Sequence, residues 1–323
     1  MVVNRRRETS SSDQRLKSTK RPTISIIGAG RLGTALARAL AQSGYTIKAL
    51  MARSLRHAKR AAELIGTHPL ALTSRQLNQL PLSDILFITT PDDSVAKVAD
   101  ELAATINSRR LQIKGQSKRP GQTALHTSGA LSSAALESLR EVGFATGSMH
   151  PLVSVSDSIH GAQSLRSAFF CVEGSRAAVL VARQMVRVLG AESFSISAED
   201  KALYHAAAVM ASGHTTALFD IAMEMLTRCG LPPSRARKVL LPLLRSTLEN
   251  LYTNDPARAL TGTFARADTA TVRRHLAALR GVAMPEALAA YQLLGRRSLR
   301  LAKAAGASSG ALKAIEQALK KQR

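Results

Sequence analysis

The sequence of 323 residues has no tryptophan, 3% aromatic residues and two cysteines. It has no run of about 18 uninterrupted apolar residues, so we expect no membrane span. Cys171 and Cys229 stand in apolar surroundings without the spacing of metal ligands, and one possible pair is no disulfide framework. We therefore expect a soluble protein of a reducing, cytoplasmic compartment, without a metal site.

Acidic residues are also scarce: 22 Asp and Glu stand against 45 Lys and Arg, a formal net charge of +23. Such a charge would suit a nucleic-acid partner, because lysine and arginine neutralise phosphates. However, much of the excess lies in residues 1–21, 105–121 and 296–323, and the few aromatic residues leave little to stack on bases. We favour a solvated basic surface over nucleic-acid binding.

The chain is long enough, and at 45% hydrophobic residues apolar enough, to form two domains. Residues 1–21 have almost no apolar side chains and predict a disordered basic tail, whose composition also resembles a transit peptide. In residues 22–197 short apolar strands alternate with helices, which predicts a doubly wound, Rossmann-type parallel sheet. The pattern of residues 198–323 predicts an all-helical domain with breaks at glycine and proline. The predicted strands are 24–27, 45–51, 84–90, 123–127, 145–148, 168–173 and 192–196.

A glycine turn, GAGRLG at residues 28–33, follows the first predicted strand and opens a helix. In the dinucleotide fingerprint the first glycine allows the turn, the second lets a pyrophosphate approach the backbone, and the third lets the helix pack on the strand. Phosphates would then lie at the helix N-terminus. The alternative is a glycine turn that only packs the sheet. The residues predicted to bind a dinucleotide here are Gly28, Gly30, Arg31, Leu32 and Gly33.

The end of the second predicted strand has no acid, whereas an NAD site usually has Asp or Glu there to bind the ribose hydroxyls. That place holds Arg53 and Ser54, and the next acid is Glu63. Arginine can pair with a 2′-phosphate that a carboxylate would repel, which favours NADP over NAD. The alternative for Arg53 is an ordinary surface residue. The residues predicted to line the nicotinamide-ribose pocket are Thr89, Thr90 and Pro91.

Candidate reactive side chains stand near the ends of predicted strands. His126 and Ser128-Gly129 occur in HTSG, and His150 occurs in GSMHPL. A histidine titrates near neutrality and can protonate the oxygen or nitrogen of a group that receives hydride. Each histidine is equally compatible with a structural hydrogen bond.

The predicted helical domain adds a lysine, a histidine and an arginine. Lys201 and His205 are spaced i, i+4, so both project from one helix face. The alternative is a solvated lysine and a buried, hydrogen-bonded histidine. Arg266 precedes Asp268 in an interruption between helices, where it could bind a substrate carboxylate. Asp268 could orient that arginine or cap the next helix.

These motifs together resemble a known family. TTPDD, HTSGAL, GSMHPL, DKALYHAAAV and ALTGTFARAD, with the glycine turn, are similar to Rossmann-like proteins whose C-terminal half is called domain of unknown function 2520. The similarity covers Pro22 to about Leu279. The family resembles the superfamily of pyrroline-5-carboxylate reductase, prephenate dehydrogenase and 3-hydroxyisobutyrate dehydrogenase, and its members are described as NADP-dependent oxidoreductases.

The resemblance implies a cofactor domain, a helical domain that forms a homodimer, and an active site between them. It implies Lys201 or His205 as the proton donor and Ser128, His150 and Arg266 as substrate contacts. His150, as a titrating histidine, is a third catalytic candidate. The substrate-binding candidates are His126, Ser128, Gly129 and Arg266. The expected reaction is hydride transfer between NADP and a small carbonyl, hydroxyl or imine substrate that bears a carboxylate. The alternatives are an NADP-binding sensor or scaffold without turnover and, less favoured, a basic nucleic-acid-binding protein.

Overall fold

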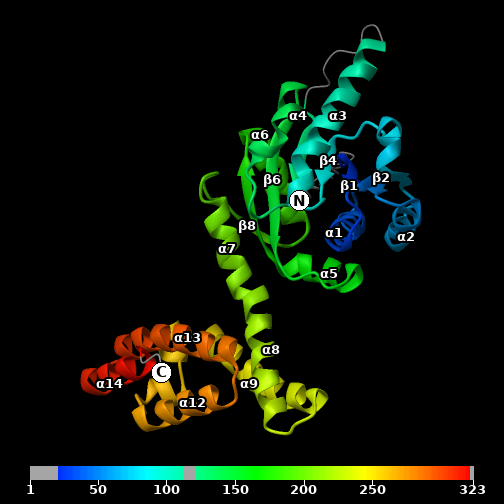
Figure 1. The fold of residues 1–323 in the computed structure, drawn as a ribbon. Helices are drawn as coiled ribbons and strands as arrows, with labels where there is room; N and C mark the ends of the chain where they lie inside the picture. Colours follow the sequence, from blue (N-terminus) through cyan, green and yellow to red (C-terminus); the bar gives the residue numbers. More distant parts are fainter. Residues whose placement is uncertain (1–20, 113–120, 321–323) are drawn as a thin grey trace, which may run out of the picture. The chain divides into compact units, whose positions relative to one another are not determined.

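The computed structural model describes residues 21–112 and 121–320. The predicted basic tail, except for its last residue, and residues 113–120 of the basic segment 105–121 lie outside these residues. The chain forms two compact units, residues 1–208 and 209–323 (Figure 1). No helix in the described ranges is long and apolar enough to cross a membrane.

The first unit is built on one sheet of eight strands in the order β3-β2-β1-β4-β5-β6-β7-β8. Strands β1 to β6 run parallel, β7 is antiparallel to β6, and β8 is parallel to β7. The predicted doubly wound, Rossmann-type parallel sheet is therefore confirmed over its first six strands. The strands are β1 (Thr23–Ile27), β2 (Thr46–Ala52), β3 (Leu70–Thr73), β4 (Ile85–Ile88), β5 (Thr123–His126), β6 (Ala145–Leu152), β7 (Phe169–Gly174) and β8 (Glu192–Phe194).

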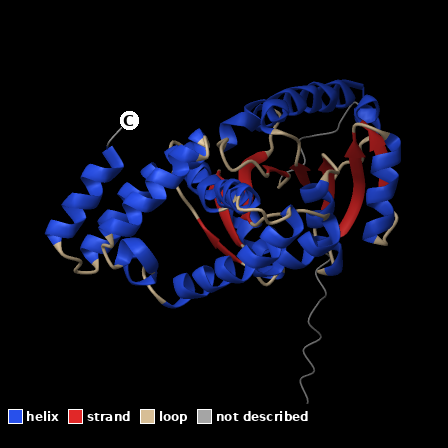
Figure 2. Cartoon of the chain, turned by 60° about the horizontal axis from the view of Figure 1, so that its bottom comes forward, coloured by secondary structure: helices blue, strands red, loops and turns tan. Residues whose placement is uncertain are grey.

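Helices cover both faces of this sheet, because alternate strand residues point to opposite sides. On β4, Ile85 and Phe87 belong to one apolar cluster, while Leu86 and Ile88 belong to the other. Figure 2 shows the strands enclosed by helices in this unit. The α-helices are α1 (Arg31–Gln42), α2 (Leu55–Ile65), α3 (Asp92–Gln112), α4 (Glu137–Glu141), α5 (Ser158–Ser164) and α6 (Arg176–Val188); the 3-10 helices are η1 (Ser74–Gln79), η2 (Ser133–Leu136) and η3 (Leu165–Ser167).

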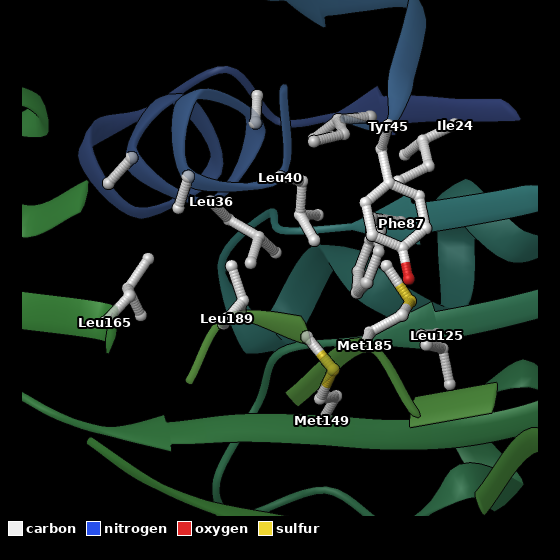
Figure 3. Packing of buried hydrophobic residues seen from close by; sticks show 14 of the residues in the cluster. Ile24, Leu36, Leu40, Tyr45, Phe87, Leu125, Met149, Leu165, Met185 and Leu189 are labelled. Carbon is white, nitrogen blue, oxygen red and sulfur yellow. The ribbon is translucent and has the colours of Figure 1, made fainter. Parts of the chain in front are cut away.

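The core on one face packs α1 against the centre of the sheet. Leu36 and Leu40, one helical turn apart, point with Phe87 into the apolar cluster drawn in Figure 3, which Met149 and Met185 complete. All five side chains are essentially inaccessible to solvent. This packing fixes the start of α1, and with it the glycine turn, relative to the strand ends.

The seven predicted strands are present, with ends that differ by a few residues. β3 was not predicted, because it has only four residues. β6 continues past its predicted end, Ser148, to Leu152 and so includes His150. The sheet departs from the parallel direction at β7: Leu152 pairs with Phe169, so the chain re-enters the sheet beside the point where it left and reverses direction.

The second unit is helical, and the predicted breaks at glycine and proline are confirmed. A further helix, α7 (Lys201–Ala211), crosses the boundary between the units. Val272 and Leu276 on one helix pack with Leu299 and Ile315 from two others in the larger apolar cluster. The helices of this unit are α8 (Gly213–Arg228), α9 (Pro233–Thr253), α10 (Pro256–Ala259), α11 (Gly262–Ala265), α12 (Thr269–Gly281), α13 (Pro285–Ala304) and α14 (Ser309–Lys320).

Candidate active site

The glycine turn joins β1 to α1. Two of its three glycine positions need glycine, one because of its backbone conformation and one for lack of space. Gly28 has φ +107°, a conformation that L side chains rarely adopt. A Cβ on Gly33 would lie 2.2 Å from the Gly28 carbonyl oxygen and 2.4 Å from Thr89 Oγ1. A Cβ on Gly30 would meet nothing closer than 4.0 Å. The second glycine therefore faces open space, as the dinucleotide fingerprint requires.

The N-terminus of α1 lacks a side-chain cap. Gly30 is the N-cap, no side chain of the described residues caps the helix, and its first turn has no acidic residue. Arg31 is exposed and Leu32 half-buried in this turn. An anion is the ligand that such a helix end favours.

The end of β2 presents cationic and hydroxyl groups. Arg53 and Ser54 are exposed just after the strand, and Ser54 Oγ accepts a hydrogen bond from His57 N at 3.3 Å as the N-cap of α2. The first turn of α2 has no acid and adds Arg56, which is also exposed. These groups fit a phosphate better than a ribose with two free hydroxyls.

The residues after β4 divide between two roles. The Thr89 hydroxyl donates to the Gly28 carbonyl oxygen at 2.6 Å, so it braces the glycine turn. The Thr90 hydroxyl is buried and has no hydrogen-bond partner in the described part of the chain. Pro91 is exposed. An orphaned buried hydroxyl beside the glycine turn is compatible with a polar ligand there.

His126 is wholly buried and both of its ring nitrogens are engaged by backbone. Nε2 donates to the Ser132 carbonyl oxygen at 3.0 Å, and Nδ1 accepts from the Ser128 amide at 3.2 Å. Burial lowers the pKa of His126 to about 4. The Ser128 hydroxyl is likewise occupied, because it accepts from the amides of Ala130 and Leu131 at 3.1 and 3.0 Å. These predicted substrate contacts thus hold the turn of residues 126–132.

Lys201 begins α7 and is buried, with 1% of its surface exposed. Its Nζ donates to the Ser128 carbonyl oxygen at 3.2 Å and to Ser148 Oγ at 3.0 Å. No carboxylate of the described residues lies within ion-pair distance of this nitrogen. Burial lowers the pKa of Lys201, while Cys171, Glu173 and Asp92 oppose that change. An ammonium has three donors, so two bonds leave one donor for a ligand.

His150 lies beside this lysine, held by Tyr204. A hydrogen bond of 2.7 Å joins His150 Nδ1 to the Tyr204 hydroxyl, which also bonds the buried thiol of Cys171. The His205 ring packs edge-on against His150, with ring centroids 5.6 Å apart. Burial, followed by the charge of Lys201, lowers the pKa of His150 to about 4. His150 is therefore neutral at physiological pH, with Nε2 as the ring nitrogen open to a ligand.

Gly129 lets these imidazoles come close to the turn after β5. A Cβ there would lie 2.5 Å from His205 Cδ2 and 2.9 Å from His150 Cε1 and Nε2. The structure thus brings His150, Lys201, His205 and the Ser128-Gly129 turn together, all within the first unit.

Arg266 belongs to the second unit, where it is exposed and ends α11. The predicted capping role of Asp268 is confirmed, since its carboxylate accepts from Thr271 N at 3.0 Å at the start of α12. A substrate contact through Arg266 stays a prediction.

Four residues at this site were not predicted: Ser148, Cys171, Glu173 and Tyr204. Ser148 and Tyr204 stand inside the motifs GSMHPL and DKALYH, so proximity to His150 and Lys201 was the signal for them. Cys171 and Glu173 lie on the reversed strand β7, which aligns them with His150 and Ser148. Nothing in their local sequence indicates that pairing.

The carboxyl ends of β1, β4, β5 and β6 follow one another in the sheet. Three interstrand steps of about 4.8 Å put the glycine turn and Ser148, the acceptor of Lys201 on β6, roughly 14 Å apart. The strand order changes direction between β1 and β4, and open α/β sheets bind ligands at such a point. The glycine turn, the uncapped helix, the orphaned hydroxyl and the acid-free end of β2 fit a dinucleotide that carries an extra phosphate.

Two family models match the sequence. Residues 7–151 match a Rossmann-like domain, and residues 168–298 match the domain of unknown function 2520. Among curated proteins, none matches this chain.

Solved structures share the fold at low sequence identity. A "putative NADP oxidoreductase" from Bacteroides fragilis has a TM-score of 0.67 and 22% identity over 87% of this chain and 99% of its own. An imine reductase from Myxococcus stipitatus, in complex with NADP⁺, has a TM-score of 0.56 and 19% identity over 91% and 99%. A pyrroline carboxylate reductase from Plasmodium falciparum, with NADP bound, has a TM-score of 0.53 and 11% identity over 93% and 99%.

The likeness to these structures extends over both units. The first family model ends at Pro151 in β6, and the second begins at Ala168, just before β7. The chain thus combines a Rossmann-like domain with a domain of unknown function 2520.

Proposed function

We propose that this chain is an NADP-dependent oxidoreductase that transfers hydride to or from a small carbonyl, hydroxyl or imine compound bearing a carboxylate. The observation that carries the proposal is Lys201: an ammonium buried to 1% exposure, without a carboxylate partner among the described residues, at the carboxyl edge of a dinucleotide-type sheet. Burying an unpaired charge costs several kcal/mol. Function is a reason to keep it.

Recognition of the cofactor rests on three places in the first unit. Gly30 and the amides that open α1 would face the pyrophosphate, and Arg53 with Ser54 would pair with the 2′-phosphate. The Thr90 hydroxyl, which is buried without a partner in the described ranges, would meet the nicotinamide ribose. Two of the similar structures contain NADP, which supports this reading.

Lys201 is the side chain best suited to hold and give the proton. When bound, NADPH would supply a hydride to the substrate carbon. Lys201 Nζ then gives a proton to the oxygen or nitrogen of the same double bond, and in the opposite direction Nζ takes that proton back. His150 is neutral, so it orients the substrate through Nε2 rather than serving as the acid.

The charge of Lys201 favours an anionic substrate, because its ammonium has one donor left for a ligand while the neighbouring His150 is neutral. Arg266 stays a predicted contact for the substrate carboxylate.

Calorimetric titration of the purified chain with NADPH and NADH tests the cofactor assignment. We expect tighter binding of NADPH, and at least tenfold weaker binding of NADPH by Arg53→Gln with little change for NADH. Arg176→Gln is the matched control, because Arg176 is exposed and follows the reversed strand β7. Tighter binding of NADH by the unaltered chain would contradict the assignment.

Oxidation of NADPH with a panel of small 2-oxoacids and cyclic imino acids tests turnover. Any activity should be lost in Lys201→Met, which keeps the length of the side chain and removes its proton. NADPH binding should persist in that variant. A chain that binds NADPH and turns over none of the panel would instead favour a sensor or scaffold.

A further inference from the structure

The antiparallel pair among the described strands, β6 with β7, sets two polar side chains of β6 opposite two of β7. Ser148 is the partner of Glu173, and His150 is the partner of Cys171. Because side chains two residues apart share a face of a strand, these two pairs form adjacent rows on one face. The start of α7 contacts both rows, since Lys201 binds Ser148 and Tyr204 binds His150.

The first row links the buried lysine to a carboxylate through one hydroxyl. Lys201 Nζ donates to Ser148 Oγ at 3.0 Å, and Ser148 Oγ donates to Glu173 Oε2 at 3.5 Å. Ser148 has no exposed surface, so this hydroxyl is shielded from water. Its single proton and its acceptor lone pairs suit the two bonds.

Glu173 is held in place from its other side. Ser133 donates to it twice, from its amide to Oε2 at 2.8 Å and from its hydroxyl to Oε1 at 2.7 Å. The carboxylate therefore has a fixed position on β7 rather than a choice of rotamers.

We propose that Glu173 is a positioning residue for the reaction, and that its carboxylate, acting through the Ser148 hydroxyl, orients Lys201 Nζ and keeps it protonated. This inference deepens the proposed function and rests on it, because it takes Lys201 as the proton donor.

Several other titratable groups face Lys201, and each is a weaker partner. The Cys171 thiol stays protonated because burial raises its pKa. Burial lowers the pKa of His126 and of His150 to about 4, which leaves these two imidazoles neutral. Asp92 is exposed in the first turn of α3, so water screens its charge. The groups that face Lys201 are Cys171 and Glu173 on β7, His126 on β5, His150 on β6, Asp92 on α3 and Tyr204 on α7.

The test is a pH titration of Lys201 in the full chain. NMR of lysines labelled with ¹³C at Cε monitors the titration, and Lys201→Arg identifies the signal of Lys201. We expect Glu173→Gln to lower the pKa of Lys201 by roughly one, a tenfold weaker proton affinity, from a charge about 6 Å away at partial screening. Glu192→Gln, which removes an exposed carboxylate from β8, should leave it unchanged. A folded Glu173→Gln chain with an unaltered Lys201 pKa would overturn the proposal.

Two further variants separate the electrostatic effect of Glu173 on Lys201 from a structural effect. Ser148→Ala keeps the Glu173 charge and removes the bridge, and should also lower the pKa of Lys201. Ser133→Ala loosens Glu173 without touching Lys201, and should change it little. If Glu173→Gln does not fold, Ser148→Ala decides, and an unchanged pKa there overturns the proposal. Neither cofactor nor substrate is used, so failure to bind NADPH would refute the proposed function without affecting this result.

Discussion

The three glycines of the turn at residues 28–33 make a prediction that separates folding from cofactor binding. Gly33 and Gly30 are both changed to alanine, one at a time. The added methyl group meets the turn itself in the first variant and open space in the second. We expect Gly33→Ala to lose stability and Gly30→Ala to lose NADPH binding while it keeps its stability.

The magnitudes follow from the distances. At Gly33 the new Cβ would lie 2.2 and 2.4 Å from two oxygens, whereas non-bonded atoms sit about 3.5 Å apart, so the backbone must move by about 1 Å. Such overpacking costs about 3 kcal/mol, or a melting temperature lower by about 6 to 12 °C in a unit of this size.

At Gly30 the expected change in stability is close to zero. Alanine is a poorer N-cap than glycine by about 0.5 kcal/mol, but it also restricts the unfolded chain by a similar amount. The methyl group would occupy the approach to the α1 amides, which should weaken NADPH binding at least tenfold, about 1.4 kcal/mol.

Thermal unfolding and calorimetric titration of the three chains check both halves. The reasoning is refuted if Gly30→Ala binds NADPH as tightly as the unaltered chain. It is also refuted if Gly33→Ala melts at the same temperature, because the turn would then tolerate a side chain.

Three other perturbations have defined outcomes. Gly129→Ala should cost about 1 to 3 kcal/mol and break the bond between His150 and Tyr204, because its Cβ would lie within 2.9 Å of both imidazoles; an unchanged chemical shift of the His150 ring would contradict this. Burial lowers the pKa of His126 to about 4 in the folded chain, from an ordinary value of 6.5. His126 therefore contributes about 3 kcal/mol of stability above pH 6.5, which is lost as the pH falls toward 4. His126→Asn should therefore flatten the fall of the denaturant midpoint over that range, whereas His57→Asn, an exposed control, should not. The pKa of Lys201 is lowered from 10.5, so the unfolded chain holds this proton more tightly than the folded chain. The free energy of unfolding should therefore rise with pH toward 10.5, relative to that of Lys201→Met. Parallel pH dependences of stability in the two chains would contradict this.

The order of elements in the first unit was predictable because glycine, proline and apolar runs mark its strands and helices. The glycine turn and the acid-free end of β2 are local features, so their place at the carboxyl edge followed from the pattern. β3 was not predicted because four residues are too few to establish a periodic hydrophobic pattern. The reversal of β7 was not predicted because the alternation of apolar and polar residues in a strand does not indicate the direction of the strand.

The lysine site was predictable only in part, since its residues come from separate strands. The spacing of Lys201 and His205 gave a shared helix face, and HTSG and GSMHPL gave two strand ends. The acceptors of Lys201 depend on tertiary pairing, which local sequence does not record. His126 and Ser128 hydrogen-bond backbone groups of their own turn. This role depends on which backbone groups of the folded turn need a partner, and the sequence does not indicate that.

The two polar rows determine how α7 lies in register on the sheet. Ser148 and His150 are separated by two strand residues, about 6.6 Å, and Lys201 and Tyr204 by three helix residues, a rise of about 4.5 Å. The long lysine side chain covers the difference, so one turn of helix engages both rows. A slip of α7 by one residue would bury the ammonium without its acceptors and leave His150 Nδ1 unpaired, at a cost of several kcal/mol. The register of α7 on the sheet is therefore fixed by the same polar groups that make Lys201 suitable as a proton donor.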